Sequence, residues 1–346
     1  MPQAPPDASS ILIVRPSALG DVARSVPVLA SLRAAYPSAR IDWLVRDSFA
    51  PIIAAHPGLS NVVPFPRKEL SRWVRTLQWG KVKEYIGTLR TPKFDLVFDC
   101  QGLARSALLA RATGAKIRVG TRDAREFGWV PMTHRVKTPK VFHTVDKMLA
   151  LLEAVGIPAL KTAEASQLYT SAADRAWLAK ESFANHRYVV IAPTSAWPAK
   201  EWPADRFAEV AKYIASKNVA VVIVGGPSER DRILPLIELS QRNPLVLDRV
   251  GKTTVGQLMA VIEGSIGVLS NDSASLHIGV GFQRPVVALF GPTDMRLAAP
   301  YGKTAIVLQH VQDGDEFYFR DDRSAGMIRR IETNEVVEAV DRVMRL

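Results

Sequence analysis

Cysteine is nearly absent from this chain of 346 residues, in which Cys100 is the single one. One cysteine cannot form an internal disulfide, and no Cys/His cluster has the spacing of a zinc site. Long hydrophobic runs are missing too. The longest, such as residues 219–224, are far shorter than the roughly 20 residues of a membrane-spanning helix. We therefore expect a protein of a reducing compartment without a metal site.

A secretory signal is also missing, because the opening residues MPQAPPDASS contain no cationic stretch that leads into an apolar segment. This predicts a soluble cytoplasmic protein that can touch a surface. Acidic residues are scarce in one half only. Residues 1–165 contain 24 Lys+Arg and 13 Asp+Glu, whereas residues 166–346 contain 21 of each. The excess of +11 predicts an anionic partner for the first half, namely nucleic acid, a phosphorylated ligand or a membrane face. A basic surface kept for solubility is the alternative.

Short β-branched runs alternate with amphipathic segments, a pattern that predicts parallel sheets wrapped by helices. The expected strands are residues 11–15, 41–45, 62–65, 96–99, 117–120, 188–192, 220–224, 245–248, 267–270 and 286–290. The chain is longer than the roughly 250–300 residues at which one core stops growing. We therefore predict two doubly wound α/β domains, residues 1–165 and 175–346, facing each other across a cleft. The polar stretch 160–174 contains the junction.

The first predicted strand runs straight into Gly20-Asp21 and then into a helix. Ligands of open α/β sheets bind beyond the carboxyl ends of the strands. The Asp21 carboxylate is therefore either a helix cap or a catalytic group.

The most basic segment is 65–93, in which Trp73 and Trp79 lie among six cations: Arg67, Lys68, Arg72, Arg75, Lys81 and Lys83. Basic and aromatic side chains together favour a phosphate beside an apolar group, as in a lipid headgroup. Nucleic-acid binders have the same mixture. An ordinary surface helix is the third possibility.

Loops after the predicted strands of the second half have the chemistry of a nucleotide site. Thr194, Ser195 and Lys200 offer two hydroxyls and an ammonium to a diphosphate; a turn with a solvated lysine is the alternative. Glu229, in VGGPSERD, is placed either to accept from ribose hydroxyls or to favour a helix N-terminus. Thr253, in VGKTT, is placed to frame a purine, and no complete phosphate-binding GxxxxGK[ST] loop is present.

The stretch SNDSASLH, residues 270–277, predicts a helix N-terminus capped by Asn271-Asp272-Ser273. Its unpaired N–H groups, at Ser273 and Ala274 above all, suit a phosphate. His277, one turn into this helix, is either a ligand contact or a packed core residue.

These loops, together with SALGDV, AKEWP, GGPSE, GKTT and RPVVALFGPTD, resemble glycosyltransferase family 9, the ADP-heptose:lipopolysaccharide heptosyltransferases with the GT-B fold. The likeness extends from Ile11 to about Glu338. DCQGLARSALLA and DAREF are most similar to heptosyltransferase I, whereas PAKEWP is similar to heptosyltransferase II. Two departures are Ala274, where the family usually has glycine, and Ala18, where serine is frequent. If position 274 needs a positive φ, alanine is unfavourable there.

The resemblance implies an inverting, metal-independent enzyme without a cofactor, which moves heptose from ADP-L-glycero-D-manno-heptose to Kdo of Kdo-lipid A. Asp21 would be the general base and Lys200 would stabilise the leaving ADP. The implied donor-binding residues are Thr194, Ser195, Lys200, Glu229, Thr253, Asp272, Ser273, Ala274 and His277. The implied acceptor-binding residues are Arg67, Lys68, Arg72, Gln101 and Arg125.

We also expect a monomer, without nucleic acid, attached peripherally to the inner leaflet of the cytoplasmic membrane, and a last helix that packs back on the first domain. Three alternatives stay open at this stage. The chain could be a heptosyltransferase II-type or other family 9 enzyme that adds a later sugar. It could be a nucleotide-sugar epimerase on the same two-domain plan. It could also be a degenerate, non-enzymatic membrane- or RNA-binding module.

Overall fold

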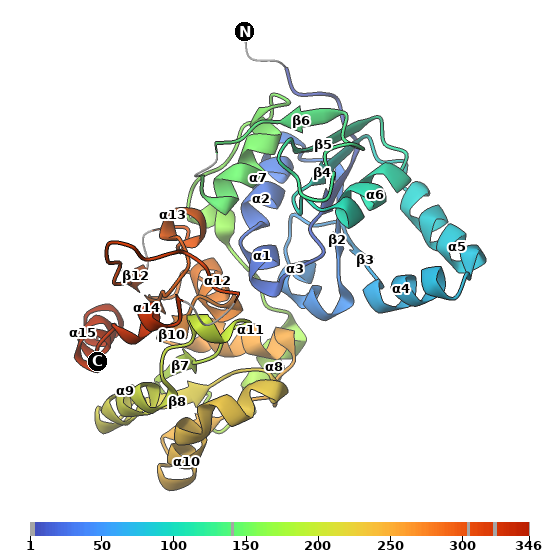
Figure 1. The fold of residues 1–346 in the computed structure, drawn as a ribbon. Helices are drawn as coiled ribbons and strands as arrows, with labels where there is room; N and C mark the ends of the chain where they lie inside the picture. The colour runs from blue at the N-terminus through green and yellow to red at the C-terminus, as the bar shows by residue number, and fades with distance from the viewer. Residues whose placement is uncertain (1–3, 140–141, 303–304, 321–323, 346) are drawn as a thin grey trace. The chain divides into compact units, whose positions relative to one another are not determined.

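The computed structural model describes residues 4–139, 142–302, 305–320 and 324–345 (Figure 1). Within it the chain forms two compact units, of which the first ends at Ser166 and the second begins at Gln167. No helix in the described ranges is long and apolar enough to cross a membrane.

The first unit is built on a parallel sheet of six strands in the order β3-β2-β1-β4-β5-β6. The strands are β1 (Ser10–Val14), β2 (Arg40–Val45), β3 (Asn61–Pro64), β4 (Leu96–Asp99), β5 (Ile117–Thr121) and β6 (His134–Val136). The helices are α1 (Leu19–Ala23), α2 (Val26–Ala35), α3 (Pro51–Ala54), α4 (Arg67–Arg75), α5 (Trp79–Arg90), α6 (Ala104–Ala112) and α7 (Thr144–Glu153).

The second unit repeats this plan in the order β12-β11-β10-β7-β8-β9. Its strands are β7 (Tyr188–Ala192), β8 (Ala220–Ile223), β9 (Val246–Asp248), β10 (Gly267–Asn271), β11 (Val286–Leu289) and β12 (Ala305–Leu308). Its helices are α8 (Ala172–Leu178), α9 (Ala204–Ser216), α10 (Leu234–Arg242), α11 (Val255–Gly264), α12 (Ala274–Gly281), α13 (Met295–Ala298), α14 (Gly326–Arg329) and α15 (Thr333–Met344).

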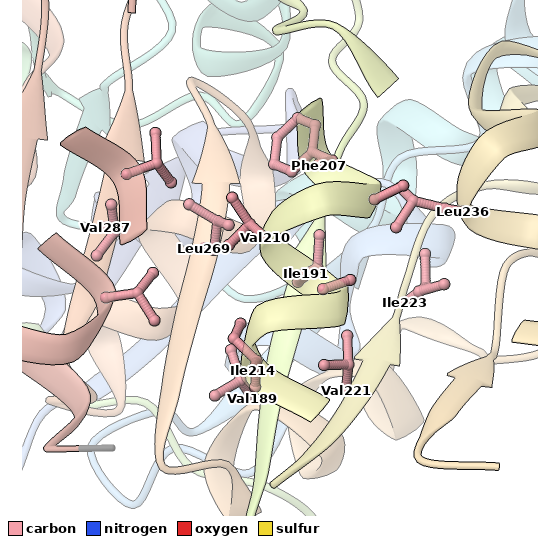
Figure 2. Packing of buried hydrophobic residues seen from close by; sticks show 14 of the residues in the cluster. Val189, Ile191, Phe207, Val210, Ile214, Val221, Ile223, Leu236, Leu269 and Val287 are labelled. Atoms are coloured by element: carbon pink, nitrogen blue, oxygen red, sulfur yellow. The ribbon is translucent and has the colours of Figure 1, made fainter. Parts of the chain in front are cut away.

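Both sheets are buried by helices because their strands are apolar on both faces, as parallel strands must be. In the second unit the apolar stripe of α9 covers one face, and Figure 2 shows Phe207 and Val210 over Ile191 and Leu269. The last helix, α15, packs against α9 and against β10, β11 and β12. Its predicted packing on the first domain stays a prediction.

Each sheet reverses its winding between two central strands, β1 and β4 in the first unit and β7 and β10 in the second. Loops that leave such a pair at their carboxyl ends turn to opposite faces and leave a crevice between them. The segments that follow these four strands carry Asp21, Gln101, Lys200 and Asp272. The sheet order therefore selects the two places where chemistry is expected.

All ten predicted strands are present, with ends that shift by one residue at most. The short edge strands β6 and β12 were not predicted. Trp73 is half-buried and packs against the hydrophobic core of the first unit together with Leu70, one helical turn away, which for this residue favours the alternative of an ordinary surface helix. Trp79, in contrast, is 57% exposed.

Candidate functional site

Asp21 lies in the first turn of α1, and its carboxylate caps that turn and also binds two arginines. The Ala18 N–H donates to Oδ2 at 3.2 Å. Arg15 Nη2 lies 3.0 Å from the same oxygen, and Arg24 Nε donates to Oδ1 at 3.0 Å. Arg24 lies on the next turn, whereas Arg15 directly follows β1. The side chain of Asp21 keeps 25% of its surface exposed, so a ligand can reach it.

The two guanidiniums decide the ionisation of Asp21. Burial alone would raise the pKa of this carboxyl, but Arg15 and Arg24 outweigh burial and hold the pKa well below its usual range. The group is therefore a permanent anion near neutral pH and a weak proton acceptor. Such a carboxylate suits a reaction in which the proton becomes acidic before it is transferred.

A cavity of about 280 Å³ lies at the same edge of the first sheet. Its polar lining includes Arg15, Gln101, Arg125 and Lys147. The side-chain oxygen of Gln101 accepts from the Ser17 N–H at 3.2 Å, which ties the loop after β4 to the loop after β1. Because Arg15 both lines the cavity and binds Asp21, an anion in the cavity would lie within reach of the catalytic candidate.

The predicted acceptor residues are divided between two places. Gln101 and Arg125 line the cavity, whereas Arg67, Lys68 and Arg72 lie exposed on α4 and do not line it. The structure therefore does not gather these five residues into one pocket. The α4 cations belong to a separate basic surface of the same unit.

Asp99 at the end of β4 shapes the loop that carries Gln101. Its carboxylate is 2% exposed and accepts from Ser106 Oγ at 2.9 Å and from the N–H groups of Gln101 and Gly102 at 3.0 and 3.2 Å. Burial outweighs these donors and raises the pKa of Asp99 to about 6. Asp99 was predicted at the end of a strand, without a role in the site.

At the switch point of the second sheet Lys200 forms an ion pair with Asp272. The Lys200 Nζ lies 2.6 Å from Asp272 Oδ2, and both side chains are about a tenth exposed, at 11% and 9%. Thr293 Oγ1 donates to the same oxygen at 2.8 Å, and the centroid of the Phe319 ring lies 3.9 Å from the ammonium nitrogen. Burial alone would raise the pKa of Asp272, but Lys200 outweighs burial and lowers it.

The loop after β7 joins the loops after β8 and β9. Thr194 Oγ1 donates to Glu229 Oε2 at 2.6 Å, and the Gly226 N–H donates to the same oxygen at 2.7 Å. The Gly251 N–H donates to the Gly225 oxygen at 2.9 Å. Glu229 lies in the first turn of a 3₁₀ helix, Pro227–Ile233. A negative charge is favourable at this N-terminal end, which is one of the two roles predicted for Glu229.

Ser195 and Thr253 complete these loops. Ser195 Oγ donates to the backbone carbonyl oxygen of Asp272 at 3.1 Å, which links the loops after β7 and β10. Thr253 is half-buried in the loop that follows β9, two residues after Gly251. The structure thus brings the loops of the predicted donor residues to one edge of the second sheet.

The predicted helix after β10 is α12, with Ser273 at its N-cap position. The Ser273 hydroxyl does not cap the helix but lies 2.8 Å from the Ser270 hydroxyl. Ala274 is the first helical residue and is not among the residues with positive φ, so alanine causes no backbone strain there. His277 is buried, with 8% of its surface exposed.

Four residues near these sites had no predicted role, namely Arg15, Lys147, Thr293 and Phe319. A role for Arg15 could have been predicted, because a cation that directly follows a central strand lies at the edge of the sheet where ligands bind. The other three come from segments far along the chain, and only the fold brings them to the sites. Within the described ranges, no three His, Cys, Asp or Glu side chains cluster as metal ligands do.

Comparison with known proteins gives a consistent result. A family model described as glycosyltransferase family 9 (heptosyltransferase) matches residues 82–324, more than two thirds of the chain. Lipopolysaccharide heptosyltransferase 1 of Pseudomonas aeruginosa is 28% identical over 307 residues, 86% of this chain and 83% of that protein. Lipopolysaccharide heptosyltransferase 3 of Escherichia coli K12 is also 28% identical, over 83% of this chain and 84% of that protein.

Among solved structures, the E. coli ADP-heptose lipopolysaccharide heptosyltransferase II superposes with a TM-score of 0.78 at 22% identity, covering 97% of this chain and 98% of that one. At this identity the likeness concerns the fold. It confirms the predicted GT-B class, with two parallel six-stranded α/β sheets.

Proposed function

The chain belongs to glycosyltransferase family 9, the heptosyltransferases, and on that premise we propose that it moves a heptose from ADP-L-glycero-D-manno-heptose to the Kdo of the lipopolysaccharide inner core. Membership makes it an enzyme, a glycosyltransferase. The observation that supports the choice of step is the likeness of DCQGLARSALLA and DAREF to heptosyltransferase I, because overall identity is 28% to heptosyltransferase 1 and to heptosyltransferase 3 alike. A phosphorylated Kdo-lipid A is then the acceptor.

In the proposed reaction Asp21 acts as the general base. The acceptor oxygen forms a bond to the anomeric carbon as the bond from that carbon to the diphosphate breaks, so the configuration inverts and ADP leaves. The acceptor hydroxyl becomes acidic once its oxygen bonds to carbon, and the proton then passes to Asp21. Although Arg15 and Arg24 make Asp21 a weak base, a weak base can accept a proton that has become this acidic. Asp21 also offsets positive charge on an oxocarbenium-like transition state.

The donor is proposed to bind at the edge of the second sheet. Lys200 and the N–H groups at the start of α12 stabilise negative charge that grows on the departing diphosphate. Thr194 and Ser195 add hydroxyl donors. Asp272 holds the ammonium in place through its 2.6 Å contact, and a positioned ammonium loses less freedom when the donor binds.

Glu229 is proposed to accept from the ribose hydroxyls, and Thr253 borders the adenine. The contact between Glu229 and Thr194 supports this assignment, because it places the ribose candidate beside a phosphate candidate. The burial of His277 favours a packing role over direct donor contact, and we propose that it supports the Asp272 loop.

The acceptor is proposed to bind in the cavity of the first unit, where Arg125, Gln101 and Lys147 meet its phosphates and carboxylates. The basic surface of α4 then faces the inner leaflet of the cytoplasmic membrane. Arg67, Lys68 and Arg72 lie exposed there, and Leu77 and Trp79 close by are 69% and 57% exposed. Cations beside exposed apolar groups suit an anionic lipid surface.

One experiment tests the step, namely release of ADP from ADP-heptose by the purified chain with two acceptors. We expect rapid release with Kdo-lipid A and little with the same acceptor that already carries one heptose. The reverse preference would assign the chain to a later step, an alternative that the equal identity to heptosyltransferase 3 favours. Binding to vesicles or RNA without ADP release from either acceptor would overturn the enzymatic proposal.

A further inference from the structure

The first unit contains a second hollow, of about 400 Å³, lined by three arginines. Arg90 is the last residue of α5, Arg111 lies in the last turn of α6, and Arg118 is the second residue of β5. Helices α5 and α6 lie side by side on one face of the sheet (Figure 1). Both end where β4 and β5 begin, so the hollow lies at the amino edge of the sheet. Asp21 and the acceptor cavity lie at the carboxyl edge.

Backbone carbonyls fix two of these arginines without neutralising them. Arg90 Nε donates to the Ala112 oxygen at 3.0 Å, and Arg118 Nε donates to the Pro131 oxygen at 2.8 Å. Arg118 also donates to the Ala115 oxygen. Among the described residues no carboxylate lies within ion-pair distance of any of the three guanidiniums. The hollow therefore holds three positive charges, of which backbone carbonyls hold two in place, and all three guanidiniums keep donors for a ligand.

Three other arginines, Arg15, Arg24 and Arg249, each bind a carboxylate, and in this the cluster in the hollow differs from them. The charges in the hollow repel one another. Burial lowers the pKa of Arg118, and the nearby Arg111 lowers it further. The negative ends of α5 and α6 offset part of this repulsion. A bound anion would remove the rest.

We propose that this hollow is a binding site for a phosphate group joined to an apolar moiety. Guanidinium groups match phosphate oxygens in geometry and charge. Ile86 and Leu108 supply the apolar wall, and Leu108 is 61% exposed. The phosphate belongs either to a small phosphorylated metabolite or to a phospholipid headgroup. The site goes beyond the proposed transfer reaction and does not depend on it.

Local hydrogen exchange tests the site with the full chain and inorganic phosphate, at ionic strength matched with potassium chloride. We expect phosphate to slow exchange in residues 86–90 and 108–118. Arg111→Glu should weaken this protection about tenfold, the loss of roughly one charge-assisted bond. Arg111 is exposed, and its side chain makes no hydrogen bond to any described residue, so folding should survive. The matched control is Arg242→Glu, an exposed arginine at the end of α10 in the other unit.

A second arm compares sedimentation with vesicles of phosphatidylglycerol and of phosphatidylcholine. Weaker binding of Arg111→Glu than of Arg242→Glu to phosphatidylglycerol alone assigns the site to a lipid headgroup. Phosphate protection that is lost in Arg111→Glu, with equal vesicle binding of both variants, assigns it to a free phosphorylated ligand. Protection that persists in Arg111→Glu, or no protection together with equal vesicle binding, would overturn the proposal.

Discussion

The two units share one sheet plan and differ in the charge at its switch point. In the first unit one carboxylate, Asp21, is bound by two guanidiniums. In the second unit one ammonium, Lys200, is bound by one carboxylate, Asp272. The same contrast holds for whole halves of the sequence, since residues 1–165 have an excess of 11 positive charges and residues 166–346 have none.

Two units with one fold can thus differ in the sign of the charge at the site, because a few loops set that charge. At the first edge the excess cations keep Asp21 ionised and leave a positive field for an anionic ligand. At the second edge the balanced pair fixes the ammonium, and the attraction for phosphate rests on N–H groups and hydroxyls as well. The two edges therefore suit different anions, a multiply charged acceptor and a single diphosphate.

Removing the charge of Asp21, the carboxylate that two guanidiniums bind, should have the largest effect on turnover. Asp21→Asn should lower turnover by about 10²–10⁴-fold, because the proton loses its acceptor. Affinity for ADP-heptose should stay unchanged, since the donor is proposed to bind on the second unit. Steady-state ADP release and calorimetry measure the two quantities. Asp205→Asn, an exposed position at the start of α9, is the control, and near-normal turnover of Asp21→Asn would eliminate the general base.

Breaking the balanced pair separates its structural role from its role toward the donor. Lys200→Met leaves Asp272 buried without its cation, which should cost about 3–5 kcal/mol in free energy of unfolding. The double variant Lys200→Met/Asp272→Asn should recover most of that stability and still bind ADP-heptose poorly. Chemical denaturation and calorimetry report the two effects. Normal donor affinity in the double variant would remove Lys200 from the phosphate site.

The pH dependence of stability tests whether burial or hydrogen-bond donors set the pKa of Asp99, at the carboxyl edge of the first sheet. Its folded pKa of about 6 lies above the ordinary value of 3.8, so folding favours the protonated form of this carboxyl relative to the unfolded chain. Its contribution to stability is full below pH 4 and is lost as the pH rises through 6, a change of about 3 kcal/mol. Denaturation from pH 4 to 7 should therefore show wild type losing stability relative to Asp99→Asn. A constant difference would mean that its three hydrogen-bond donors keep Asp99 ionised.

The smallest expected effect concerns the positive field of the cavity. Arg125→Glu should raise the acceptor KM about tenfold, or about 1.4 kcal/mol, and leave the donor KM unchanged. The effect should weaken with added salt, because partly exposed charges are screened. Arg122→Glu, an exposed position in the same loop, supplies the control. A change confined to the donor KM would contradict the assignment of the cavity to the acceptor.

The strands could be predicted because buried parallel strands are continuous apolar runs. Length does not explain the two missed strands, since the edge strands β3 and β9 have four and three residues and both were predicted. β6 is HRV, a largely polar run that breaks the apolar rule. β12 is AIVL, which follows the rule, so its strand was readable from the sequence. The inward position of Trp73 was readable, since Leu70 precedes it by one helical turn.

Long-range pairs could not be predicted in the same way. The Asp21–Arg24 pair has a helical spacing and is visible in the sequence. Lys200 and Asp272 are 72 positions apart, and their contact requires that β7 and β10 be neighbours. Strand order depends on how the whole chain winds, which local pattern does not encode. For the same reason the positions of Lys147 and Phe319 near the sites could not be predicted.

The reversal of winding at the two central strands has a consequence for how such an enzyme can change. Binding residues such as Arg125 and Glu229 follow β5 and β8, away from the points where the winding reverses, whereas the proposed base Asp21 follows β1 and the Lys200–Asp272 pair follows β7 and β10. Insertions or exchanges in the outlying connections would leave Asp21 and that pair in place. A scaffold of this kind can be redirected to a different sugar chain by editing its margins alone.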